Sequence, residues 1–126
     1  MQRNSQESKG HQDLINMMAR YFATQGYRNI KADLPEMTSP DIIYGTKRNH
    51  IPDLTANKNG TMVILEAETS STISDDHTAS QWSLFSDAAK KAGGEFYIVI
   101  PKGYRNYAEQ RLAELCIGAD SIWTPT

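Results

Sequence analysis

The sequence has 126 residues, of which 39% are hydrophobic and 22% are charged, as is usual for a globular domain. This length predicts one domain, over residues 1–126, with a hydrophobic core of its own. The net charge of −2 excludes a strongly basic protein that would bind nucleic acid through its overall charge. The single cysteine, Cys116, excludes an internal disulfide and a multi-cysteine zinc site.

The sequence also predicts a cytosolic location and no membrane partner. No apolar run approaches the roughly 18 residues that span a bilayer, and the polar N-terminus lacks the apolar segment of a signal peptide.

The first predicted element is a helix over residues 11–25, after a polar stretch, 1–9, that we expect to fray. Its apolar side chains recur at helical spacing, and Gly26 is a stop signal; these side chains are Leu14, Ile15, Met18 and Phe22. His11 and Asp13 lie in the first turn. We interpret them as solvated residues of a helix start, where acids are favoured.

A short strand is predicted over residues 27–34, followed by a loop from Pro35 to Pro40. Residues 41–45 fit either a brief strand or an excursion of the chain.

Residues 50–69 predict a β-hairpin. Asn59-Gly60 is the strongest short signal for a two-residue turn, because both positions of a type I′ turn need positive φ. With these two residues as the loop, cross-strand partners have numbers that sum to 119, such as Leu54 with Leu65.

This register brings three carboxylates together. Asp53 falls opposite Glu66, and Glu68 projects from the same face because strand side chains alternate. Opposed like charges destabilise a sheet unless they share a proton or a cation. Oxygen ligands suit Mg²⁺ or Mn²⁺. The alternative is a polar hairpin face with the acids in water, but the apolar run 62–65 favours a strand that is buried on both faces.

The remaining elements alternate between helix and strand. A Ser/Thr/Asp-rich loop over 70–77 precedes a helix over 78–92, a strand over 96–101, a helix from 104 or 106 to 116, and a strand over 121–124. We expect inward side chains on both helices, and Cys116 as a buried thiol; the inward set is Ala79, Trp82, Phe85, Ala89, Tyr107, Ala108, Leu112 and Leu115. The order predicts an α/β fold with a mixed central sheet flanked by helices.

The charges are unevenly distributed along the chain. Residues 66–87 carry five acids and no Lys or Arg, whereas residues 90–111 carry five bases and two acids. An acidic centre beside basic segments fits a metal site next to a polyanion, although ordinary surface scatter gives the same pattern.

The acids also resemble a known signature. Pro52-Asp53, a twelve-residue interval and Glu66-Ala67-Glu68 are similar to the motif of the PD-(D/E)XK nuclease superfamily. Gln81, followed by Phe85, resembles a Gln-x-x-x-Tyr element that some of these nucleases carry. The N-terminal helix and residues 93–101 look most like the small archaeal Holliday-junction resolvases.

The resemblance implies a restriction-endonuclease-like core and a metal-dependent endonuclease that cleaves DNA. Asp53, Glu66, the Ala67 carbonyl and Glu68 would hold Mg²⁺ or Mn²⁺, and Gln81 would orient a ligand or phosphate. The family's usual lysine is Glu68 here, which would accept a proton or hold a second metal. The DNA-binding residues would be Lys90, Lys91, Lys102 and Arg105, of which Lys90 and Lys102 are the candidates for a displaced catalytic lysine. A homodimer is expected if both strands of a duplex are cut.

Two other functions stay open at this level. One is a nuclease-fold module that binds nucleic acid or a protein partner without cleavage, which the substitution of Lys by Glu68 and the negative net charge favour. The other is an unrelated α/β domain whose acids only solvate a hairpin.

Overall fold

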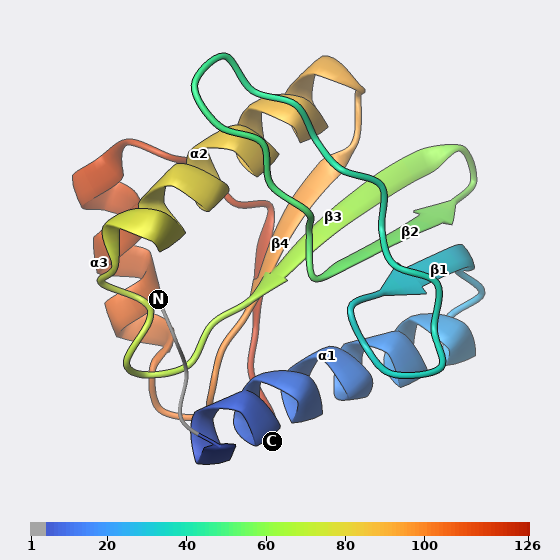
Figure 1. Ribbon diagram of the computed structural model, residues 1–126, viewed down its shortest axis with the longest axis horizontal. Helices are drawn as coiled ribbons and strands as arrows, with labels where there is room; N and C mark the ends of the chain where they lie inside the picture. The colour runs from blue at the N-terminus through green and yellow to red at the C-terminus, as the bar shows by residue number, and fades with distance from the viewer. Residues whose placement is uncertain (1–4) are drawn as a thin grey trace.

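The computed structural model describes the backbone of residues 5–126 and the side chains from residue 8 onward. The elements follow the predicted order (Figure 1): α1 (Ser5–Thr24), β1 (Arg28–Ala32), β2 (Leu54–Lys58), β3 (Thr61–Ala67), α2 (Asp76–Lys91), β4 (Glu95–Val99), α3 (Arg105–Leu115) and β5 (Ser121–Trp123). The predicted α/β class with a mixed sheet is confirmed.

The five strands form one sheet in the order β1-β2-β3-β4-β5. The first three strands are antiparallel neighbours, whereas β3, β4 and β5 run parallel. Parallel neighbours need a long crossover connection, and α2 and α3 supply these two crossovers.

Helices cover both faces of the sheet. The core on one face contains α1 with Val63 and Leu65 of β3, and the core on the other contains α2 and α3 with Ile64. Figure 1 shows α1 along the bottom, on the opposite side of the sheet from α2 and α3. The central strand β3 is therefore buried on both faces, as the apolar run predicts.

The hairpin has the predicted register. Leu54 pairs with Leu65, and Lys58 pairs with Thr61, so the numbers of partners sum to 119. Asn59 and Gly60 have φ values of 51° and 81°, as a two-residue type I′ turn requires. This register fixes which side chains at the open end of the hairpin meet.

The structure corrects the expectation for the N-terminal stretch and decides between the two interpretations of residues 41–45. Residues 5–9 belong to α1 instead of fraying, and the ion pair between Lys9 and Asp13, one helical turn apart, supports this extension. Residues 41–45 form no strand, because only Ile43 makes an isolated bridge, to His50. The expectation for residues 1–4 lies outside the described residues.

Two side chains predicted to face inward are exposed. Tyr107 of α3 is 62% exposed. Cys116 is exposed because α3 ends at Leu115, and Cys116 adopts the left-handed conformation of a helix cap, with φ of 56°. Among the described residues, no helix combines the length and apolar character needed to cross a bilayer.

Candidate functional site

Asp53 and Glu66 hold each other in place where β2 begins and β3 ends. The Asp53 backbone N–H donates to Glu66 Oε1 at 2.9 Å, and the Ala67 backbone N–H donates to Asp53 Oδ2 at 2.9 Å. Both carboxylates are thus positioned by backbone groups of the opposite strand. Of the three carboxylates predicted to converge, Asp53 and Glu66 are linked in this way.

These acids are not solvated. Asp53 is 8% exposed, whereas Glu66 and Glu68 are each 1% exposed. The alternative in which the carboxylates extend into water is therefore wrong.

His11 is a site residue that the sequence interpretation missed. Its Nε2 lies 3.1 Å from Asp53 Oδ2, and its side chain is buried instead of solvated at the helix start. A signal existed, because His11 precedes Leu14 and Ile15 by three and four residues and so shares the apolar face of α1. Asp13, by contrast, is exposed, as expected.

The electrostatic environment of Glu66 opposes a negative charge. Burial, and then the neighbouring carboxylates of Asp53 and Glu68, raise the pKa of Glu66 well above its ordinary value. The hydrogen bond from the Asp53 backbone acts in the other direction and is outweighed. The carboxyl groups of Glu66 and Asp53 also lie within hydrogen-bonding reach. This pair is suited to share a proton or a cation.

Glu68 faces a different set of partners. Its Oε1 accepts hydrogen bonds from the hydroxyls of Thr72 at 2.8 Å and Thr78 at 3.3 Å. Thr72 also accepts a bond from the Thr69 backbone N–H, so these contacts organise the turn that leads into α2. Glu68 anchors that turn from inside the protein.

Asp53 and Glu66 open into a small polar pocket of about 190 Å³, which we call the acid pocket. Residues from five parts of the chain line it: His11, Asp33, Ile51, Asp53, Glu66, Thr72, Asp75, His77, Thr78 and Gln81. The structure thus brings Gln81 to the two carboxylates, as the resemblance implies. Glu68 and Ala67 do not line the pocket.

Of the acids that line the pocket, Asp53 and Glu66 are the two linked by hydrogen bonds across the hairpin. Among the residues that the structure describes, no group of three or more His, Cys, Asp or Glu side chains is arranged to hold a metal ion. The Ala67 contact to Asp53 is made by its N–H group.

The predicted DNA-binding residues lie away from this pocket. Lys90 and Lys91 are in the last turn of α2, and Lys91 is ten residues, or about 15 Å of helix, beyond Gln81. Lys102 borders a different pocket near Thr69, and Arg105 donates to the Ile122 carbonyl at 2.6 Å.

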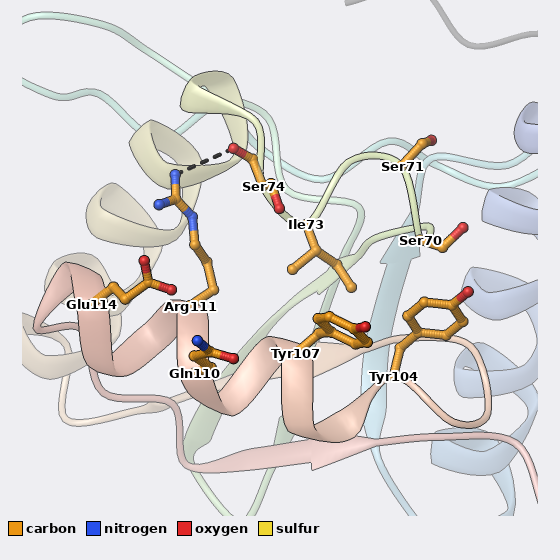
Figure 2. A pocket seen from close by; sticks show the side chains of 9 residues that line it. All are labelled: Ser70, Ser71, Ile73, Ser74, Tyr104, Tyr107, Gln110, Arg111 and Glu114. Carbon is orange, nitrogen blue, oxygen red and sulfur yellow. Dashed lines mark hydrogen bonds between the residues drawn. The ribbon is translucent and has the colours of Figure 1, made fainter.

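A larger pocket of about 520 Å³ shares the 70–75 turn with the acid pocket. Figure 2 shows Tyr107 of α3, and Tyr104 directly before this helix, beneath the turn. Arg111 of α3 extends up to the turn and donates to the Ser74 carbonyl at 3.4 Å. The turn therefore makes hydrogen bonds on both sides, with Glu68 inside the protein and with Arg111 of α3.

No protein-family model matches this chain, and no curated protein sequence is significantly similar to it. The fold resembles the crystal structure of AF1548, a protein of unknown function, with a TM-score of 0.56 and 17% sequence identity. The match covers 86% of this chain and 56% of that one, so this chain spans little more than half its length. At this identity the likeness concerns the fold alone.

Proposed function

We propose that the protein is a metal-dependent endonuclease that hydrolyses phosphodiester bonds in DNA. The observation that carries this proposal is the pair of Asp53 and Glu66. The two carboxylates are buried, and each accepts a hydrogen bond from a backbone N–H group of the opposite strand. Both face one polar pocket, and burial and like charge raise the pKa of Glu66. Opposed like charges destabilise a sheet, and buried carboxyl groups with a raised pKa cluster at functional sites.

The donor set fits Mg²⁺ or Mn²⁺. These hard cations prefer oxygen ligands, and Mg²⁺ commonly binds one or two carboxylates while water and substrate phosphate complete its coordination. Asp53 and Glu66, which line the acid pocket together, would be the protein ligands. When bound, the cation would polarise the scissile phosphate and lower the pKa of a water molecule.

The surrounding residues of the chain hold and orient this pair. His11 and the Ala67 N–H group fix the orientation of Asp53 through Oδ2. The Gln81 amide lies at the pocket and can donate to a phosphate oxygen. Proton acceptors that line the pocket besides the two ligands are Asp33, Asp75 and His77.

Glu68 has a positioning role in this proposal. In the family that the motif resembles, a lysine at this position assists the attacking water. Here the side chain accepts hydrogen bonds from Thr72 and Thr78, which keeps the 69–75 turn against the pocket. Its negative charge also raises the pKa of Glu66 and so strengthens the demand for a cation.

The test compares wild-type protein with Asp53→Asn and Glu66→Gln on branched, duplex and single-stranded DNA, in Mg²⁺, Mn²⁺ or EDTA. Of these three proteins, we expect only the wild type to cleave, and only in the presence of metal, with all three equally folded by circular dichroism. Asp13→Asn is the matched control, because Asp13 is an exposed acid on α1. This variant should cleave DNA as the wild type does. Cleavage retained in Asp53→Asn contradicts the proposal.

A second candidate is a binding module that has this fold but does not cleave. Two observations favour it: no group of three or more possible metal ligands is arranged to hold an ion within the described residues, and a hydrogen-bonded Glu68 stands in place of the lysine. Titration with Mn²⁺, followed by calorimetry, separates the candidates. A wild-type protein that neither binds the ion nor cleaves DNA supports the binding module.

A further inference from the structure

A groove runs along the outer side of α2, beside the segment that joins β1 to β2. This groove, which we call the basic groove, has a volume of about 550 Å³. One wall is residues 44–48, and the other is the exposed side of α2 from Ser80 to Lys91. Figure 1 shows the segment between β1 and β2 passing beside α2.

The basic groove continues from the acid pocket. On α2, His77 and Gln81 line the acid pocket, whereas Leu84, Ala88 and Lys91 line the groove. These five positions are separated by three or four residues and therefore form one stripe along the helix. On the facing wall, residues 51 and 53 line the acid pocket and residues 44–48 line the groove. The same two segments, α2 and residues 44–53, thus contribute to both hollows.

The groove is positively charged, unlike the pocket that it joins. Lys47, Arg48 and Lys91 line it, against one acid, Asp87. None of the three cations forms an ion pair within the described residues. Tyr44, at the same wall, is 73% exposed and offers a ring to stack on.

The wall of residues 44–48 is held in shape before any ligand binds. The Gly45 N–H group donates to Asn49 Oδ1 at 3.1 Å, and a Cβ at Gly45 would collide with the Arg48 carbonyl. The base of the wall is fastened to α2, because His50 Nε2 lies 3.0 Å from Ser80 Oγ. A preformed wall loses less entropy on binding than a mobile loop would.

We infer that the basic groove binds the phosphate backbone of the DNA strand whose scissile phosphate enters the acid pocket. This inference rests on the proposed function, and it assigns substrate binding to Lys47 and Arg48 together with Lys91. The stripe from His77 to Lys91 is about 21 Å long, which matches about six nucleotides at ~3.4 Å each. The DNA phosphates would neutralise the positive charges of the basic groove, while the metal ion would neutralise the carboxylates of the acid pocket.

The test measures binding in EDTA, so that neither metal binding nor cleavage contributes. The anisotropy of a fluorescein-labelled DNA duplex is followed with wild type, with the triple variant Lys47→Ala/Arg48→Ala/Lys91→Ala, and with a control, Lys9→Ala/Lys31→Ala/Lys58→Ala. The control removes the same charge from α1, β1 and β2. We expect the groove variant to bind about tenfold or more weakly, and its dependence of log K on log salt to fall by about 2 to 3. The control should stay close to the wild type.

Failure of this inference is distinguishable from failure of the nuclease proposal. Equal losses in both triple variants, no loss in the groove variant, or no DNA binding by the wild type would each overturn the inference. Groove-dependent binding without cleavage in Mg²⁺ would sustain the groove and reject the endonuclease. Cleavage at the wild-type rate by the groove variant would sustain the endonuclease and reject the groove as its DNA-binding surface.

Discussion

His11 Nε2 lies 3.1 Å from Asp53 Oδ2 and joins α1 to the start of β2, across 42 positions of sequence. The same oxygen accepts the Ala67 N–H group from β3. The orientation of this carboxylate is therefore fixed by two partners, one in the helical layer and one in the sheet.

Replacing His11 by alanine should weaken the site without unfolding the protein. Partners that orient a metal ligand are typically worth about 10- to 100-fold in metal affinity or activity. We expect a loss of this size for His11→Ala, measured by Mn²⁺ calorimetry and by cleavage rates. His11→Gln, which keeps a donor, should recover part of it. Asp13→Ala is the control on the same helix, and an equal effect of both changes would refute the orienting role.

Glu66→Gln should make the metal-free protein more stable at neutral pH. A raised pKa means that folded Glu66 keeps its proton as the pH rises above about 4.5, whereas unfolded Glu66 loses it. The free energy of unfolding contributed by Glu66 therefore falls as the pH rises through this window. Gln keeps an oxygen for the Asp53 N–H group and does not titrate.

Urea unfolding in EDTA at several pH values measures this difference. The advantage of Glu66→Gln over the wild type should grow with pH, whereas the exposed control Glu109→Gln should show no such trend. Mg²⁺ should raise the free energy of unfolding of the wild type and of Glu109→Gln, but not of Glu66→Gln, which lacks one of the two proposed metal ligands. A difference that is independent of pH would show that Glu66 ionises normally.

Thr72→Val should destabilise the turn beside the acid pocket. The substitution keeps the side-chain shape but removes a hydroxyl that donates to Glu68 and accepts from the Thr69 N–H group. Leaving buried polar groups without this partner costs about 1–3 kcal/mol, measurable by urea unfolding. Thr61→Val, at the start of β3, is the control and should change stability little. Equal effects of the two substitutions would argue against the anchoring role of Glu68.

Gly60→Ala should destabilise the hairpin that brings Asp53 to Glu66. Gly60 has a φ of 81°, where a side chain costs about 1–2 kcal/mol. Gly10→Ala is a matched change in α1, where an added Cβ meets nothing within 4 Å and alanine favours a helix by up to about 1 kcal/mol. The two variants should shift the melting temperature in opposite directions. A neutral Gly60→Ala would contradict the requirement for positive φ.

Much of the fold could be predicted because its signals are local. Asn59-Gly60 specified the turn, and the alternation of side chains then placed Asp53 with Glu66. The apolar run 62–65 predicted a strand buried on both faces. Local signals failed where a helix began or ended: α1 started earlier than its apolar stripe, and Cys116 became an exposed cap.

The candidate site was only partly predictable. Asp53, Glu66 and Gln81 were brought together as expected, but Glu68 turned to Thr72 and Thr78. The residues missed, above all His11, reach the site from another layer of the fold. The residue pattern of one helix or strand does not predict which side chains of another element will contact it.

By itself, the sequence determined the elements, the register of the central hairpin and the opposition of two acids, because each depends on residues near one another in the chain. Only the tertiary structure decided that His11 supports Asp53 and that residues 44–48 lie against α2. These contacts arise when helices pack on the two faces of a finished sheet, so their geometry depends on the whole fold.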